Sequence, residues 1–127
     1  IQRLYSNGMK EAHMRPACPP LVYKCKFLNF SRSKSEMDLA CRWAIKDMGD
    51  DTPDLKEYTT AGSAKYNAMV ERIRKKLNLT SLRYQTLDDL IAAIGLPKEK
   101  LCTYCWDGAE CGQCKKKELV VKVSRAK

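Results

Sequence analysis

The chain has no apolar run that approaches the roughly 20 residues of a membrane-spanning helix, although it is 127 residues long. No charged-then-apolar secretory leader is visible, and histidine occurs once, as His13. The sequence shows neither a Ser-His-Asp set nor a glycine-rich phosphate loop, and no paired carboxylates stand in a plausible cleft. The residues alone therefore predict one soluble globular domain without a recognisable active site.

The seven cysteines are an odd number, which disfavours a scaffold built from disulfides. Together with the missing export signal, this predicts a reducing compartment, and we expect a cytoplasmic protein. The formal net charge of +9 raises the question of nucleic acid. No aromatic-plus-basic recognition motif accompanies the charge, so we interpret the basic residues as solvated helix faces and do not expect nucleic acid as a partner.

The first residues resemble the end of an element. Residues 1–5 have the pattern of a last helical turn, and Asn7-Gly8 is a typical helix stop. A helix without a start predicts that the chain is cut from a longer protein. An extended segment follows at 10–15 and is halted by Pro16. We expect His13, on this strand, to be packed or hydrogen-bonded and not catalytic.

Hydrophobic periodicity predicts three helices, at 34–48, 63–77 and 87–94. The first should begin at a capping box of Ser33 and Glu36, and the third at Thr86. We expect loop at 50–62, a short extended piece at 80–84 and a strand at 119–123. The apolar stripes expected to be buried comprise Met37, Ala40, Cys41, Ala44 and Met48 in the first helix, widened by Trp43 and Ile45, then Tyr66, Met69, Val70, Ile73 and Leu77 in the second, and Leu87, Leu90, Ile91 and Ile94 in the third. Cys41 is accordingly interpreted as a core thiol.

Two Cys-x-x-Cys pairs, Cys102/Cys105 and Cys111/Cys114, stand close together. Four thiolates can hold a structural zinc ion, although the five residues between the pairs are fewer than zinc folds ordinarily use. An iron–sulfur cluster also takes four thiolates and can draw them from distant parts of a chain, which makes Cys25 a candidate. Some of these thiols could also bind nothing. The residues alone leave these three readings open.

Four stretches, in this order, resemble the C-terminal part of the glutamine phosphoribosylpyrophosphate amidotransferase (amidophosphoribosyltransferase) family. They are GMKEAHMRPACPP at 8–20, YKCKFLNFSRSKSEMDLA at 23–40, LTSLRYQTLDDLIAAIG at 79–95 and CTYCWDG at 102–108. The resemblance is that of a divergent, cluster-bearing member. It implies a helix-rich α/β fold in which residues 1–32 carry the last strand of a type I phosphoribosyltransferase-like sheet. Residues 33–127 would then form a C-terminal helical region with a cysteine-rich loop and tail.

The resemblance also implies a function and a ligand set. The parent enzyme would transfer glutamine-derived ammonia to phosphoribosylpyrophosphate, giving 5-phosphoribosylamine in purine biosynthesis. Its cofactors would be Mg²⁺ with phosphoribosylpyrophosphate and a four-iron–four-sulfur cluster held by Cys25, Cys102, Cys105 and an upstream cysteine. The parent would be a homo-oligomer. The chain itself would be inactive, because the cysteine nucleophile and the phosphoribosylpyrophosphate loop lie in the upstream part.

A competing hypothesis is a small zinc module that binds nucleic acid through its basic surface. It predicts a metal ion on Cys102, Cys105, Cys111 and Cys114, and binding that weakens steeply with salt.

Overall fold

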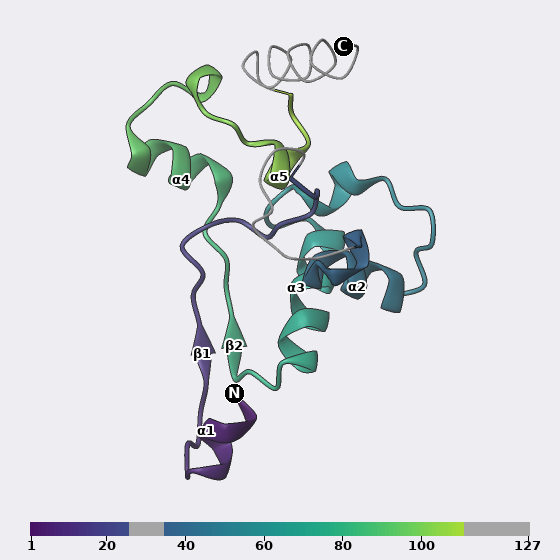
Figure 1. The fold of residues 1–127 in the computed structure, drawn as a ribbon, viewed down its shortest axis with the longest axis vertical. Helices are drawn as coiled ribbons and strands as arrows, with labels where there is room; N and C mark the ends of the chain where they lie inside the picture. The colour runs from purple at the N-terminus through teal and green to yellow at the C-terminus, as the bar shows by residue number, and fades with distance from the viewer. Residues whose placement is uncertain (26–34, 111–127) are drawn as a thin grey trace, which may run out of the picture.

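The computed structural model describes residues 1–25 and 35–110. Two helices, α2 (Ala40–Asp47) and α3 (Ala64–Lys76), pack on each other and beside a two-stranded sheet (Figure 1). The helix-rich α/β class expected from the sequence agrees with this arrangement. The predicted strand at 119–123 lies outside the described residues. No helix in the described part of the chain combines the length and the apolar composition that a membrane crossing needs.

The sheet joins two segments that are far apart in the sequence. The strands β1 (His13–Met14) and β2 (Ser81–Leu82) are parallel, and His13 lies opposite Ser81. Pairing continues at both ends of these short strands, since Thr80 N donates to Ala12 O at 2.8 Å and Gln85 N donates to Pro16 O at 3.3 Å. Parallel strands need a long crossover, and here α2 and α3 lie within it. Both extended segments were predicted, and both are confirmed.

Helix α3 confirms the prediction for 63–77 closely. Ser63 caps its start by accepting a hydrogen bond from Tyr66 N at 3.1 Å, which satisfies one of the free amides of the first turn. The side chains buried along one face are Tyr66, Met69 and Ile73. Leu77, the last member of the predicted stripe, is 38% exposed because the helix ends before it.

Helix α2 is shorter than predicted, because Leu39 adopts an extended conformation and separates it from the 3-10 turn η1 (Glu36–Asp38). The predicted stripe is wrong at Met37, Ala40 and Met48, which are exposed. Met37 lies before the break at Leu39, and Ala40 and Met48 lie at the two ends of α2. The residues that α2 buries are Cys41, Ala44 and Ile45. Cys41 is therefore confirmed as a core thiol. Ser33 of the proposed capping box lies outside the described residues.

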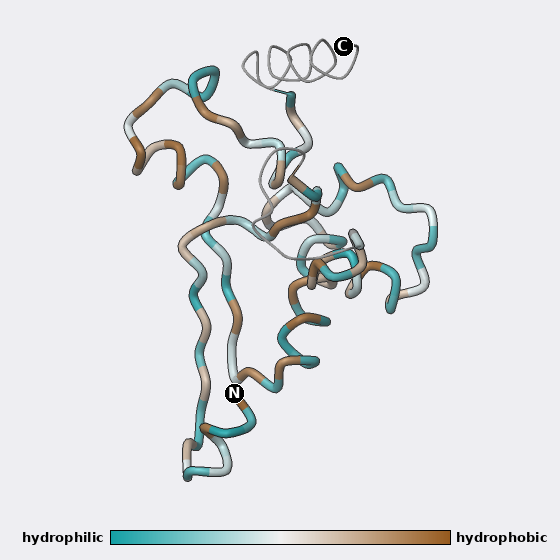
Figure 2. Tube along the Cα trace, in the orientation of Figure 1, coloured by the Kyte–Doolittle hydropathy of each residue, from teal (hydrophilic) through white to brown (hydrophobic). Residues whose placement is uncertain are grey.

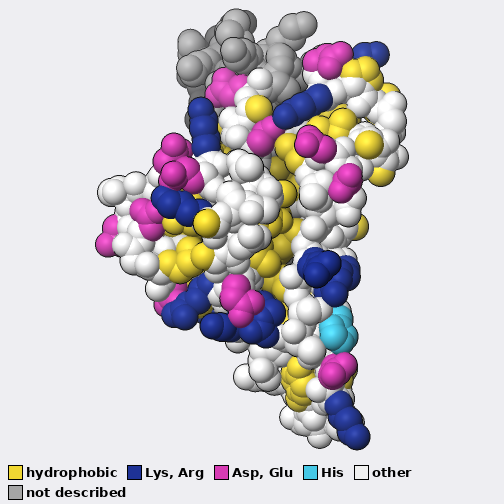
Figure 3. All heavy atoms as spheres, turned by 180° about the vertical axis from the view of Figure 1, so that it is seen from behind, with side chains coloured by type: hydrophobic (Ala, Val, Ile, Leu, Met, Phe, Trp, Pro, Cys, Tyr) yellow, Lys and Arg dark blue, Asp and Glu magenta, His cyan; other side chains and the backbone are white. Residues whose placement is uncertain are grey.

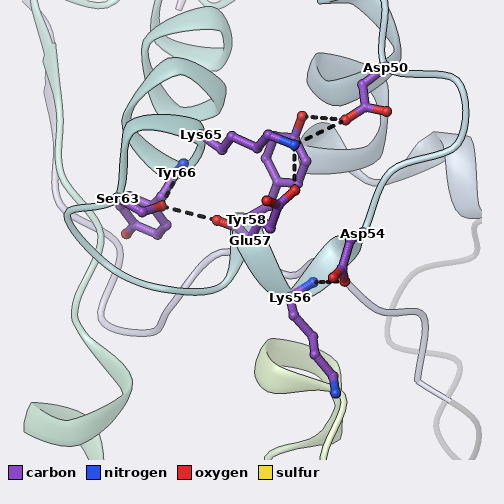
Figure 4. Close-up of polar contacts among 8 residues, drawn as sticks. All are labelled: Asp50, Asp54, Lys56, Glu57, Tyr58, Ser63, Lys65 and Tyr66. Carbon is purple, nitrogen blue, oxygen red and sulfur yellow. Dashed lines mark hydrogen bonds and ion pairs between the residues drawn. The ribbon is translucent and has the colours of Figure 1, made fainter.

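The connection at 50–62 is more ordered than the predicted loop. It contains a 3-10 turn, η2 (Leu55–Tyr58), capped by Asp54, whose side chain accepts from Lys56 N at 3.1 Å. Tyr58 is buried in the core, and Lys65 of α3 forms an ion pair with Glu57 (Figure 4). These contacts fix the connection to the first turns of α3.

Helix α4 (Leu87–Ile94) has the predicted ends but not the predicted burial. Thr86 accepts a hydrogen bond from Asp89 N, and Gly95 ends the helix in the left-handed conformation with φ +72°. None of its residues is buried, and Ile94 is 46% exposed. Figure 1 shows the reason: α4 follows the end of β2 and stands apart from α2 and α3. Its apolar residues are the brown segment beyond the end of β2 in Figure 2.

Candidate metal centre

The first Cys-x-x-Cys pair lies at a one-turn helix, α5 (Tyr104–Asp107). Cys102 precedes α5 and is exposed, whereas Cys105 lies within it and is half-buried. Cys25 is also half-buried and ends the first described stretch. The second pair, Cys111 and Cys114, lies outside the described residues.

The backbone of residues 22 and 23 is bound directly to α5. Val22 N and Tyr23 N both donate to the carbonyl oxygen of Cys105, each at 3.0 Å. Val22 itself is buried in the core between the helices and the sheet, so this segment is anchored at its base. The segment therefore delivers Cys25 to the neighbourhood of Cys105.

Cys25 and Cys102 both influence the Cys105 thiol. The pKa of the Cys105 thiol is raised to about 12, first by burial, then by the charge of Cys25 and a hydrogen bond with it, and then by the charge of Cys102. Each neighbouring thiolate makes a second negative charge more costly, so the protein alone favours protonated sulfur here. A bound cation reverses that preference, because metal ions bind thiolates.

The turn that carries Cys105 is held by a network around Asp107. Thr103, which is buried, donates its hydroxyl to this carboxylate at 3.0 Å, and Lys98 Nζ lies 3.0 Å from it. Burial raises the pKa of Asp107, but hydrogen bonds from the Ala109 amide, Lys98 and Thr103 outweigh burial and hold that pKa below its ordinary range. The carboxylate therefore stays charged and fixes both ends of α5.

A small cavity lies beside Trp106 of α5. Its volume is about 20 Å³, which is room for one water molecule. The cavity lies among Trp106, Pro20, Thr59, Tyr66 and Gln85. Trp106 Nε1 is buried and has no hydrogen-bond partner among the described residues.

His13 lies away from the cysteines. Its Nδ1 is 2.8 Å from Ser81 Oγ across the sheet, and its Nε2 is 3.2 Å from Glu11. The interpretation of His13 as a hydrogen-bonded strand residue agrees with these contacts.

Comparison with known proteins identifies relatives of one kind. No protein-family model matches the chain, and no solved structure matches it significantly. An amidophosphoribosyltransferase of Methanothermobacter thermautotrophicus is 28% identical over 108 residues, and a chloroplastic amidophosphoribosyltransferase of Glycine max is 31% identical over 109 residues. An amidophosphoribosyltransferase of Mycobacterium tuberculosis is 26% identical over 108 residues.

The chain is homologous to amidophosphoribosyltransferases. The resemblance inferred from four short stretches is thereby confirmed, and at this identity the chain is a divergent relative. Each alignment covers 85% of the chain, which spans 14% to 17% of the length of the amidophosphoribosyltransferases that it matches.

The amidophosphoribosyltransferase resemblance implies a four-iron–four-sulfur cluster on Cys25, Cys102 and Cys105. Within residues 1–25 and 35–110, no three or more His, Cys, Asp or Glu side chains are grouped closely enough to hold a metal ion. Three thiols nevertheless interact at Cys105, and thiolate sulfur is the ligand that iron–sulfur clusters take. The three cysteines therefore match a cluster in the kind of donor atom, but they are not grouped as a metal site among the described residues.

Two residues of this region were missed as site residues by the sequence interpretation. Tyr23 packs its ring beside Tyr104, with 5.7 Å between the ring centroids, and Gly108 ends α5 in the left-handed conformation. Gly108 was visible as the last residue of CTYCWDG, but the partner that makes it necessary is distant in sequence. Periodicity and spacing carry no signal for such a pair.

Proposed function

We propose that this chain is a C-terminal part of an amidophosphoribosyltransferase. The parent protein transfers glutamine-derived ammonia to phosphoribosylpyrophosphate, with Mg²⁺, and forms 5-phosphoribosylamine for purine biosynthesis in the cytoplasm. Homology over 85% of the chain supports this assignment. The chain alone is inactive, because the nucleophile that hydrolyses glutamine and the loop that binds phosphoribosylpyrophosphate belong to the remainder of the enzyme.

The proposal also divides the chain into two parts. Residues 1–32 end the phosphoribosyltransferase domain, and residues 33–127 form the helical C-terminal region. The parallel pairing of β1 with β2 joins the two parts, because β1 lies in the first part and β2 in the second. In the described residues β1 pairs with β2 alone, which leaves its other edge for strands of the parent.

Within the parent, Cys25, Cys102 and Cys105 hold a four-iron–four-sulfur cluster together with an upstream cysteine. The observation that carries this proposal is that the backbone just before Cys25 is hydrogen-bonded to Cys105, through Val22 N and Tyr23 N. The raised pKa of the Cys105 thiol, to which Cys25 and Cys102 contribute, supports it. When bound, the cluster supplies a covalent link between the segment before residue 26 and α5. The chain's own residues prepare that link, since the core holds Val22 and the Asp107 network holds α5. Loading must release protons, because the thiols bind iron as thiolates.

The test uses the full-length parent, purified without oxygen. We expect phosphoribosylamine formation from glutamine and phosphoribosylpyrophosphate, and a brown cluster absorbance. Cys25→Ser should abolish the absorbance, whereas Cys111→Ser should leave it unchanged. The isolated chain should show neither glutaminase activity nor phosphoribosyl transfer. The opposite pattern, in which Cys111→Ser removes a metal ion and Cys25→Ser does not, would replace the cluster by a zinc site on the two Cys-x-x-Cys pairs.

A further inference from the structure

The ring of Tyr23 lies against the bare Cα of Gly108. A Cβ atom added at Gly108 would stand 2.7 Å from Tyr23 Cζ and 3.0 Å from Cε1, which is closer than carbon atoms pack. Tyr23 is two residues before Cys25, and Gly108 is three residues after Cys105. The contact therefore joins the two segments that carry the thiols.

The requirement for glycine at this position goes beyond the left-handed turn. Gly95 ends α4 with nearly the same conformation, φ +72° against +74° for Gly108, and a Cβ atom there would meet nothing within 4 Å. A side chain at either position strains the backbone, because residues with a Cβ atom disfavour a positive φ. Only at Gly108 must the tyrosine ring also retreat.

A shift of the Tyr23 side chain can change the distance between the thiols of Cys25 and Cys105. The amides of Val22 and Tyr23 share the carbonyl of Cys105, and both hydrogen bonds are 3.0 Å long. Tyr104, the other ring beside Tyr23, belongs to α5 as well. The atoms that an added Cβ would meet belong to the far end of the ring, so these bonds lengthen only where the ring cannot turn aside and the backbone leading to Cys25 has to follow it.

We infer that Tyr23 and Gly108 are positioning residues of the thiol site. The ring of Tyr23 packs against Gly108, and this contact holds Cys25 close to Cys105. This inference rests on the proposed function only for the metal that the site would bind. The placement of the two thiols can be measured without any metal, by their conversion to a disulfide with diamide. In that reaction the two thiols lose two protons and two electrons, and the N=N bond of diamide takes them up to give a hydrazine.

The experiment measures the rate at which diamide forms the Cys25–Cys105 disulfide in the metal-free chain. Peptide mapping by mass spectrometry identifies this disulfide and quantifies it over time. We expect Gly108→Ala to slow it at least tenfold and Gly95→Ala to change it less than twofold. Tyr23→Phe should react like the wild type, because the ring remains. Tyr23→Ala should be slow, and Tyr23→Ala/Gly108→Ala no slower than Tyr23→Ala alone, because the added Cβ then has no ring to displace.

Equal rates for Gly108→Ala and Gly95→Ala would overturn the inference, as would a Tyr23→Ala rate equal to the wild type. Circular dichroism checks that each variant is folded, and Tyr23→Ala tests the same contact should Gly108→Ala not fold. The iron content of the full-length parent is measured separately for each variant. Absent iron in the wild type would refute the cluster and leave the thiol rates to decide the positioning role.

Discussion

The phenol of Tyr58 donates a hydrogen bond to Oδ2 of Asp50, with 2.8 Å between the two oxygens (Figure 4). Lys65 Nζ lies 3.8 Å from the same carboxylate oxygen and 5.4 Å from the centre of the Tyr58 ring. The ring of Tyr58 is buried among the side chains of the core. One residue of the connection thus links the end of α2, the turn η2 and the start of α3.

Tyr58→Phe should lower the free energy of unfolding by roughly 0.5–1.5 kcal/mol, the usual net contribution of one hydrogen bond. The ring stays in place, so packing is preserved and the loss reports the hydroxyl. Urea denaturation measures the change. Tyr5→Phe is the matched control, because the Tyr5 hydroxyl donates to Asn78 O in an exposed position and its removal should have little effect. Equal effects of the two substitutions would contradict the prediction.

Stability should fall in alkaline solution through Cys41. Burial raises the pKa of this thiol from its ordinary value of 9.0 to about 12. The folded chain therefore keeps a proton that the unfolded chain loses, and the stability that this contributes is present below pH 9 and lost as the pH rises to about 12. Unfolding measured across this range should show a shallower decline for Cys41→Ala than for the wild type. Parallel curves would show that Cys41 does not titrate as inferred.

Truncation of two isoleucines on different helices should cost very different amounts of stability. Ile73 is 2% exposed on α3, and Ile73→Ala should cost about 2–5 kcal/mol, because it removes buried methyl groups and leaves a cavity. Ile94 is 46% exposed on α4, and Ile94→Ala should cost well under 1 kcal/mol in the isolated chain. Chemical denaturation of both variants provides the comparison. A large cost at Ile94 would mean that α4 is covered in solution.

Alkylation should distinguish the cysteines by burial. Iodoacetamide added to the metal-free chain near neutral pH should modify exposed Cys102 well before Cys41, which is 2% exposed and has a raised pKa. Peptide mapping at successive times gives the order. Modification of Cys41 at the rate of Cys102 would place Cys41 outside the core.

Basic side chains form ion pairs over much of the helical surface. Arg72 pairs with Asp47, Arg74 lies 2.7 Å from Glu71, and Lys98 lies 3.0 Å from Asp107. Figure 3 shows acidic side chains among the basic ones on one face of the molecule. This pattern agrees with the interpretation of the charge as a solvated surface.

The features that the sequence predicted well are encoded locally. The ends of α3 and α4 follow from Ser63, Thr86 and Gly95, each of which acts within one turn of its own position. The burial of α4 was mispredicted because an apolar stripe shows which face can be covered, whereas the fold determines whether anything covers it. Tyr58 was missed for a similar reason, since a lone aromatic residue in a polar connection has no period.

The cysteines also show the difference between features encoded locally and features that depend on the fold. Spacing alone left a zinc site and an iron–sulfur cluster open, and Cys25 was singled out through the family resemblance. The parallel register of β1 on β2 and the seat of Tyr23 on Gly108 join residues from opposite ends of the chain. Neither contact has a local signature.

The long crossover between β1 and β2 also determines the order of assembly. Helices α2 and α3 are close in sequence and can pair early, whereas β1 must wait for β2, and closing so large a loop is slow. Cys25 and Cys105 come from the same two distant parts of the chain, so their meeting belongs to this late step. A metal centre on these thiols would consequently be inserted into a chain whose helical core has already formed, and could not serve as the nucleus around which that core folds.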